Sequence, residues 1–317
     1  MEEVEAIHRG AEIIRNGGVV AFPTETVYGL GADAFNPIAV ARVFEIKNRP
    51  IFDPLIVHIA DLNEMSRLVI DIPLSAEKLI KRFWPGPLTI VFSKKGEVPD
   101  IVTAGLPTVA IRMPRHPIAL GLIEKSGRAI AAPSANPFGY VSPTTADHVR
   151  EQLGDRVDLI LDGGPCEVGL ESTILSFSEG NPRLLRPGGL PLEEIESIIG
   201  RVNVGSTEEE NPLSPGRFPK HYAPRTPFVI EGWRDNIDLY QNKKVGLLTF
   251  RGVNVSFPFH HVELLSPEGD LREAAANLFA ALRRLDVLNL DLILAEAVPE
   301  VGLGRAIMDR LRRASKR

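Results

Sequence analysis

The sequence predicts an α/β protein with two domains, a larger mixed α/β domain followed by a small α/β domain. Short apolar runs of strand length, bounded by proline and glycine, alternate with segments in which apolar residues recur at three- and four-residue spacing. This alternation stops over residues 201–227, which are rich in proline, glycine and charge, and it resumes after them. The length of 317 residues is enough for two domains, each with its own hydrophobic core.

Composition narrows the class of protein. A hydrophobic content of 44% and a charged content of 24% are typical of a soluble globular chain. The net charge of −5 argues against a protein that coats nucleic acid. Cys166 is the single cysteine, so neither a disulfide nor a cysteine zinc cluster can form within one chain. We expect a cytoplasmic protein without a signal peptide or membrane span, because no apolar run has the length that either requires.

The first part of the chain predicts helices and strands in alternation. An amphipathic helix is indicated by the spacing of Val4, Ile7, Ala11 and Ile14. The run "GGVVAF" then predicts a buried strand that Pro23 ends. Asn36 is expected to cap the next helix, with Pro37 at its first position. Further strands are predicted by "PLIVHIA", "PLTIVF", "TVAIRMP" and "AIAAPSAN".

Two more helices and three more strands complete the larger domain. One helix is expected to start at Ser75 and to stop at Pro85-Gly86. The other covers "SPTTADHVREQLG", with Ser142 as its N-cap and Pro143 in its first turn. The remaining strands are predicted by "VDLILDGG", "STILSF" and "PRLLRPG".

The rest of the chain predicts a linker and a small parallel α/β domain. We expect the larger domain at residues 1–202, a linker or lid at 203–227 and the small domain at 228–317, because long loops without periodicity are uncommon inside a compact domain. Strands are predicted by "FVIEGW", "KVGLLTF" and "LDLILAEAVP", and helices by "DLREAAANLFAALRRLD" and "GRAIMDRLRRASKR". Asp270 and Glu273 have the spacing of a capping box.

The segment "FPTETVYGLGADAFNP" contains a G-x-G-x-x-A pattern that suggests a dinucleotide-binding turn. Residues 23–28 separate the preceding strand from Gly29, and the next helix signal comes only at Asn36, so the spacing does not fit that turn. We therefore expect the glycines to let a loop turn beside a pocket. Thr24 and Thr26 either cap that turn or line the pocket with hydroxyls.

Cations and small polar residues recur at the ends of the predicted strands and helices. Lys47 and Arg49 end a helix, whereas Arg112 and Arg186 end strands, and such cations hold polyphosphates or carboxylates. His58 interrupts an apolar strand, where a histidine is more often a core residue than a ligand. Small polar side chains occur in "APSAN" and "GLEST". No G-x-S-x-G motif, P-loop or zinc spacing is present, so the set favours a site that positions a nucleotide and a small polar substrate.

A set of motifs in this order resembles one known family over essentially the whole chain. The motifs are "PTETVYGLG", "KNRP", "PLIVHI", "WPGPLT", "TVAIRMP", "APSAN", "DGGPCEVGLESTI", "LLRPG", "SPGRFPKHYAP" and "GLGRAIMDRLRRAS". They are similar to those of the two-domain form of the YrdC/TsaC-type L-threonylcarbamoyladenylate synthases. The resemblance implies a YrdC-like mixed α/β domain with a concave binding cleft, joined to a small Rossmann-like C-terminal α/β domain.

The same resemblance implies a reaction. L-threonine, bicarbonate and ATP would give threonylcarbamoyl-AMP and pyrophosphate, and separate proteins would then transfer the threonylcarbamoyl group to tRNA, at the adenosine beside the anticodon. Carried over by motif, the L-threonine site would comprise Thr26, His58, Arg112, Ala132 and Ser172. The ATP site would comprise Arg49, Asp53, Thr108, Ser134, Asn136, Ser142, Arg186 and Tyr222. Lys47 and Arg49 would position the phosphates, with no covalent nucleophile, and Mg²⁺ would arrive with ATP rather than in a protein cage.

Asp53 departs from the pattern, since many relatives have asparagine there, and its carboxylate would repel phosphates unless Mg²⁺ or Lys47 intervenes. Tyr222 lies in the linker, which would therefore act as a lid over the nucleotide. Two alternatives remain at this point. One is a double-stranded-RNA-binding module, with weak RNA binding by the clustered cations, and the other is a carbamoyl transferase of the hydrogenase-maturation type. The sequence does not predict what the C-terminal domain does.

Overall fold

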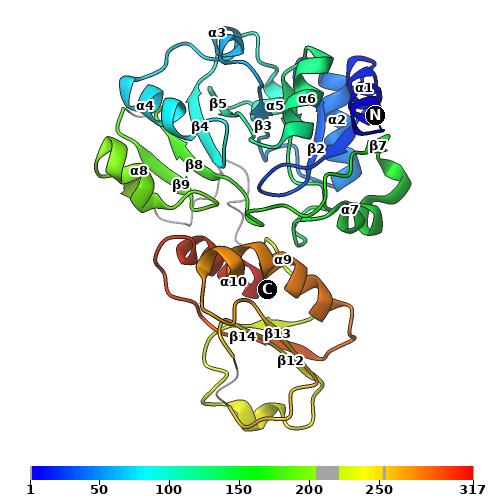
Figure 1. The fold of residues 1–317 in the computed structure, drawn as a ribbon, viewed down its shortest axis with the longest axis vertical. Helices are drawn as coiled ribbons and strands as arrows, with labels where there is room; N and C mark the ends of the chain where they lie inside the picture. Colours follow the sequence, from blue (N-terminus) through cyan, green and yellow to red (C-terminus); the bar gives the residue numbers. More distant parts are fainter. Residues whose placement is uncertain (1, 179, 205–220, 253–254, 317) are drawn as a thin grey trace.

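The computed structural model describes residues 2–178, 180–204, 221–252 and 255–316, and it contains two sheets (Figure 1). The larger sheet has ten strands in the order β10-β9-β8-β4-β5-β3-β6-β2-β1-β7, and the smaller has four in the order β11-β14-β12-β13. Within the described ranges, no helix combines the length and the apolar character needed to cross a bilayer.

The larger sheet is mixed. β3 runs parallel to β5 and antiparallel to β6, so strand ends of different parts of the chain meet near the middle of the sheet. Its strands are β1 (Val20–Phe22), β2 (Gly29–Asp33), β3 (Ile56–His58), β4 (Leu88–Ser93), β5 (Thr108–Arg112), β6 (Ile130–Ala132), β7 (Leu159–Ile160), β8 (Thr173–Ser176), β9 (Arg183–Arg186) and β10 (Asn203–Val204). β10 pairs with β9, so the sheet extends to residue 204. Residues 205–220 of the expected linker lie outside the described residues.

Helices cover both faces of this sheet. They are α1 (Glu2–Arg15), α2 (Pro37–Lys47), α3 (Met65–Leu68), α4 (Leu74–Phe83), α5 (Asp100–Thr103), α6 (Pro117–Ser126), α7 (Ala146–Leu153) and α8 (Leu192–Ile199), with 3-10 turns at Leu62–Glu64 and Gly154–Arg156. α1 and α6 pack against the face of β1 that carries Phe22, whereas α2 and α7 pack against the face that carries Ala21. The alternation of side chains along a strand places these two residues on opposite faces.

The predicted helices α1, α2, α4 and α7 are present, with differences at their starts. Asn36 caps α2 as predicted, since its side chain accepts from the backbone N–H groups of residues 38 and 39. α4 begins at Leu74 rather than Ser75. The prediction that Ser142 caps α7 is wrong: Thr145 is the N-cap, and its hydroxyl accepts from the N–H of His148 at 3.3 Å. Helices α3, α5, α6 and α8 were not predicted.

The glycines of "GLGAD" lie in a strand rather than in a loop, which corrects the sequence-based interpretation. β2 pairs antiparallel with β1, and Gly31 faces Val20 across the pair. A Cβ on Gly31 would lie 2.6 Å from the ring of Phe22 and 2.5 Å from Ile130, so the glycine makes room for that ring. The polar residues 23–28 therefore form the connection of a hairpin. The dinucleotide-binding turn is excluded, because that turn leads from a strand into a helix.

The smaller sheet is parallel throughout, as predicted for the C-terminal part. It consists of β11 (Phe228–Val229), β12 (Val245–Thr249), β13 (His261–Leu264) and β14 (Leu292–Ala295), with helices α9 (Leu271–Asp286) and α10 (Gly304–Ser315) and a 3-10 turn at Ile237–Tyr240. β13 was not predicted. Asp270 caps α9 by accepting from the N–H of Arg272 at 2.6 Å. The reciprocal half of the predicted capping box is replaced: Glu273 accepts from Ser266 Oγ, which in turn accepts from the N–H of Asp270.

Both C-terminal helices lie between the smaller sheet and the first domain (Figure 1). Gly169 of the first domain has a positive φ of +72°, and a Cβ there would lie 2.5 Å from the Cα of Ala276 in α9. Arg305 of α10 pairs with Glu193 of α8 at 3.1 Å. Val27, Leu170 and Tyr222 belong to the same buried cluster as the apolar residues of α9 and α10. The two domains therefore share a packed interface.

Candidate active site

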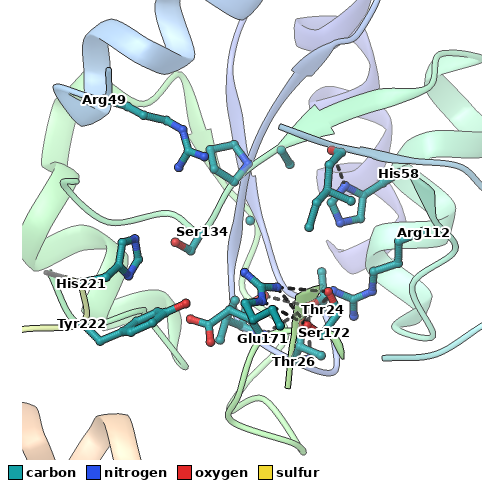
Figure 2. A pocket seen from close by; sticks show the side chains of 16 residues that line it. Thr24, Thr26, Arg49, His58, Arg112, Ser134, Glu171, Ser172, His221 and Tyr222 are labelled. Carbon is teal, nitrogen blue, oxygen red and sulfur yellow. Dashed lines mark hydrogen bonds between the residues drawn. The ribbon is translucent and has the colours of Figure 1, made fainter. Parts of the chain in front are cut away.

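A cavity lies where β1, β3, β5 and β6 end and β8 begins, and Tyr222 closes it on one side (Figure 2); its empty space is about 520 Å³ when the part open to solvent is included. The structure brings together most of the predicted site residues on its walls. These are Thr26, Arg49, His58, Arg112, Ala132, Ser134, Ser172, Arg186 and Tyr222. The other predicted residues are not among those that line it: Lys47, Asp53, Thr108, Asn136 and Ser142.

Arg112, at the end of β5, is held by three groups. Its Nη2 lies 2.8 Å from the carboxylate of Glu25, its Nη1 donates to the hydroxyl of Thr26 at 2.9 Å, and its Nε donates to the carbonyl of Gly86 at 3.2 Å. Both members of the ion pair are buried. Arg112 also lines the cavity, so its positive charge lies beside the space that an anionic ligand would occupy.

A short relay of hydroxyls connects Arg112 to the turn after β1. Thr24 Oγ1 donates to the carbonyl of Val27 at 2.7 Å and accepts the N–H groups of Thr26 and Val27. Thr26 Oγ1 lies 2.7 Å from Thr24 Oγ1, so Thr26 is the donor in that contact while it accepts from Arg112. Thr24 is thus the turn cap, whereas Thr26 lines the cavity and has one lone pair that these contacts do not use.

His58 lies at the end of β3, on the strand beside Arg112. Burial, together with the positive charge of Arg112, lowers the pKa of His58 to about 3. Its Nδ1 lies 3.2 Å from the carbonyl of Ile56. At neutral pH the ring is therefore uncharged and adds no further positive charge to this end of the cavity.

Arg49 lies on the opposite side of the cavity from Arg112 (Figure 2). It follows α2, and its guanidinium lies 2.7 Å from the carboxylate of Asp53 and donates to the carbonyls of Asp53 and Pro54. Asp53 is fully buried behind Arg49. Burial raises the pKa of Asp53 to about 6, although Arg49 opposes that shift. At neutral pH the pair is therefore charged, and Arg49 stands between Asp53 and the cavity.

Lys47, the last residue of α2, is buried and points at backbone rather than at the cavity. Its ammonium donates to the carbonyls of Ser134 and Asn136. The side-chain amide of Asn136 in turn donates to the carbonyls of Pro137 and Tyr140 at 2.8 and 2.9 Å. Lys47 and Asn136 thus fix the loop that presents Ser134 to the cavity.

Thr108 is half-buried at the start of β5. Alternation of side chains places Thr108 on the face of β5 that carries Arg112. Thr108 therefore lies on the same face of the sheet as Arg112, but it is not among the residues that line the cavity.

Ser172 and Arg186 form the wall nearest the second domain. Arg186 Nη2 donates to the carbonyl of Ser172 at 2.9 Å, and Ser172 Oγ lies 2.7 Å from the hydroxyl of Thr89. Burial lowers the pKa of Arg186. A buried cation at the cavity wall favours an anionic ligand, because the attraction would replace the hydration that burial removes.

Among the described residues that line the cavity, Glu171 is the only carboxylate, and it was not one of the predicted site residues. Its Oε1 accepts from Ser142 Oγ at 2.5 Å and its Oε2 accepts from Arg310 Nε at 2.9 Å. Burial alone would raise the pKa of Glu171, but the charges of Arg310 and Arg186 and the hydrogen bond from Ser142 hold it below its ordinary value. Ser142, predicted as an N-cap and an ATP contact, is instead placed behind this carboxylate.

Tyr222 and His221 close the cavity at the end of the linker. Tyr222 stacks on Phe279 of α9 at 5.8 Å, and its hydroxyl points into the cavity (Figure 2). That hydroxyl makes no hydrogen bond with any described residue. His221, another residue that was not predicted, lines the cavity with its ring 5.8 Å from that of Phe138. Burial and the cations around it keep the pKa of His221 well below its ordinary value, so its ring is neutral.

The sequence and the structure of this chain are both similar to those of one family of proteins. Residues 12–188 match the Sua5/YciO/YrdC family model, described as "Telomere recombination", and residues 190–316 match the model of the threonylcarbamoyl-AMP synthase C-terminal domain. Threonylcarbamoyl-AMP synthases of Pyrococcus abyssi and Bacillus subtilis are 48% and 47% identical, over 98% of this chain and 94% and 92% of theirs.

Among solved structures, P. abyssi Sua5 complexed with L-threonine superposes with a TM-score of 0.91 at 48% identity, covering 98% of this chain and 94% of that one. Neither the RNA-binding module nor the hydrogenase-maturation transferase gains support from these full-length relatives. The chain therefore belongs to the two-domain Sua5 form of the threonylcarbamoyl-AMP synthase family.

Proposed function

We propose that this protein is an L-threonylcarbamoyladenylate synthase, which forms threonylcarbamoyl-AMP and pyrophosphate from L-threonine, bicarbonate and ATP. The observation that carries the proposal is the placement of Arg112 and Arg49 on opposite sides of one cavity. Such a cavity can hold an amino-acid carboxylate at one side and a triphosphate at the other, with the reacting groups between them.

We assign the L-threonine site to the side that holds Arg112. The guanidinium of Arg112 would bind the substrate carboxylate, and Thr26 would accept a hydrogen bond from the substrate hydroxyl or amine. Neutral His58, Ala132 and Ser172 would complete the pocket. P. abyssi Sua5 has been crystallised with L-threonine, which supports a site for this amino acid in the family.

ATP would bind along the side that holds Arg49, Ser134 and Arg186. The guanidinium groups of Arg49 and Arg186 would offset charge on the phosphates and on the departing pyrophosphate. Tyr222 would cover the nucleotide, because its unpartnered hydroxyl points into the cavity. Thr108 would contact ATP only through a part of the ligand that extends beyond the cavity along β5.

The reaction would proceed in two steps that need no covalent enzyme intermediate. The amine nitrogen of threonine forms a bond to the carbon of bicarbonate, with loss of water, to give a carbamate. A carbamate oxygen then attacks the α-phosphorus of ATP, and the bond to pyrophosphate breaks. The protein supplies positions and charges for both steps rather than a nucleophile.

Mg²⁺ would accompany ATP. The described residues contain no group of three or more histidine, cysteine, aspartate or glutamate side chains that could hold a metal. Among the described residues of the cavity wall, Glu171 is the only carboxylate, and both its oxygens already accept hydrogen bonds. An ion that arrives with ATP would be held mainly by phosphates and water.

Lys47, Asn136, Asp53 and Ser142 would act through the residues that they hold. We propose that Lys47 and Asn136 position the Ser134 loop. Asp53 would orient Arg49. The expected repulsion between Asp53 and the phosphates would be offset, because the positive charge of Arg49 lies between them. Downstream, a tRNA-threonylcarbamoyl transferase would use the product.

Pyrophosphate release from ATP tests the proposal. Purified protein should release pyrophosphate only when both L-threonine and bicarbonate are present, and L-serine, which lacks the methyl group, should be a poorer substrate. Heat-inactivated protein is the control. Release that is independent of L-threonine or of bicarbonate would contradict the proposed function.

A further inference from the structure

One arginine of the C-terminal domain contacts residues that line the cavity described above. Arg310 lies in α10, and its side chain is fully buried. Its Nε donates to Oε2 of Glu171 at 2.9 Å, and its Nη1 donates to the carbonyl of Pro187 at 2.9 Å. Glu171 lines the cavity, and Pro187 directly follows Arg186, which also lines it. A side chain of the second domain thus contacts two wall segments of the first.

The same guanidinium contacts the residue that closes the cavity. Its Cζ lies 4.9 Å from the centre of the Tyr222 ring, which also stacks on Phe279. A cation over an aromatic face is attracted by the ring, more strongly when both are buried. Arg310 is oriented from its own helix by Asp309, whose carboxylate lies 2.7 Å from Nη1. Asp309 is in turn paired with Arg313 at 3.0 Å.

We propose that Arg310 is a positioning residue through which the C-terminal domain acts on the reaction, an inference that rests on the proposed function. It holds the carboxylate of Glu171 and the ring of Tyr222 in place on the nucleotide side of the cavity. The C-terminal domain is then part of the working site rather than an appended module.

The alternative is that Arg310 only stabilises the interface between the two domains. α10 offers a matched control for this, because Arg305 also bridges the domains, to Glu193. That pair lies at the surface, with side chains 31% and 50% exposed, and neither residue lines the cavity. A role in stabilising the interface alone predicts similar effects at both arginines, whereas a positioning role predicts an effect at Arg310 alone.

The experiment compares R310M, R310K, E171Q, the double variant R310M/E171Q and the control R305M in the full-length protein. Pyrophosphate release gives kcat and the KM values for ATP and L-threonine, calorimetry gives the ATP dissociation constant, and thermal unfolding reports on the fold. R310M alone leaves a buried carboxylate without its partner, so it is the variant most prone to unfold. The double variant removes both charges, so its kinetics can still be measured if R310M unfolds.

We expect R310M to raise the KM and the dissociation constant for ATP at least tenfold, with little change in the KM for L-threonine. R310K should recover part of the loss, since it keeps the charge but not the fork that reaches both Glu171 and Pro187. The double variant should be no worse than the more affected single variant, because two residues that act as a unit are not additive. R305M should stay within twofold of the wild type.

Equal kinetics for R310M and R305M would overturn the inference, as would losses from R310M and E171Q that multiply in the double variant. A wild-type protein that binds ATP but releases no pyrophosphate with L-threonine and bicarbonate would contradict the proposed function alone. In that case the ATP dissociation constants still decide the role of Arg310. A wild-type protein that binds no ATP would contradict both.

Discussion

The carboxylate of Asp53 lies 2.7 Å from the guanidinium of Arg49, and the arginine stands between that carboxylate and the cavity. Arg49 has two roles, a proposed contact with phosphate and the pairing of buried Asp53, and a single substitution of Arg49 would remove both. R49M removes the proposed phosphate contact and also leaves Asp53 buried without its partner, which costs about 3–5 kcal/mol when the charge remains. R49M/D53N removes both charges.

We therefore expect the unfolding free energy to fall in R49M and to recover most of its value in R49M/D53N, as measured by urea denaturation. Pyrophosphate release should be at least about a hundredfold slower in both, since the loss of one preorganised donor has effects of that size. Activity that recovers together with stability in the double variant would mean that Arg49 does not act on the phosphates.

Lys47 should behave as a residue that holds a loop. K47M would leave the carbonyls of Ser134 and Asn136 buried without their donor, at a cost of about 2 kcal/mol or more. The melting temperature should therefore fall, and the KM for ATP should rise through the displaced Ser134. A K47M protein with wild-type melting temperature and abolished ATP binding would instead indicate a direct phosphate contact.

Thr26 links substrate binding to the orientation of Arg112. T26S keeps the hydroxyl that accepts from Arg112 at 2.9 Å, whereas T26V removes it at nearly the same volume. We expect T26V to raise the KM for L-threonine about tenfold and T26S to change it little, with the KM for ATP unchanged in both. Steady-state kinetics with each substrate varied in turn measures this. A T26V protein with the wild-type KM for L-threonine would show that the hydroxyl of Thr26 does not contribute to binding of this substrate.

His58 should contribute to the acid sensitivity of the fold. Its pKa falls from 6.5 to about 3 on folding, because of burial and the nearby charge of Arg112. Between these two pH values the unfolded chain binds a proton at His58, whereas the folded protein does not. The contribution to stability is complete above pH 6.5 and is lost as the pH falls toward 3. Since one pKa unit corresponds to about 1.4 kcal/mol, the loss should reach about 3 kcal/mol near pH 4.5.

H58N keeps a polar group but cannot titrate, so its stability should decline less than that of the wild type on acidification. Urea midpoints of both proteins at several pH values between neutral and acidic give the difference. Parallel curves would exclude His58 as a source of the pH dependence.

The sequence predicted those elements whose signals are local. Asn36 followed by Pro37 marked the start of α2, and both lie where expected. The strand β2 was missed because glycine has a low preference for strands, and the reason for Gly31 is the ring of Phe22 on the neighbouring strand. Ser142 carried the signal of an N-cap, but its hydroxyl is engaged by Glu171, which lies far away in the sequence.

The site could be predicted where a motif of the family carries it, but not where the partners come from distant parts of the chain. Arg112, Arg49 and Thr26 lie on the cavity wall, as expected from their motifs. Glu171 was not predicted, since its partner Arg310 is 139 residues away. The placement of Lys47 against backbone also follows from tertiary contacts, because a helix-ending lysine in sequence looks the same whether it faces phosphate or carbonyl groups.

The most direct test of the account is detection of the product itself. The protein would be incubated with ATP, L-threonine and isotopically labelled bicarbonate, and the nucleotides would be separated and analysed by mass spectrometry. We predict threonylcarbamoyl-AMP that carries the labelled carbon, in an amount equal to the pyrophosphate released and absent when L-threonine is omitted. Pyrophosphate release without a labelled threonine–AMP conjugate would contradict it.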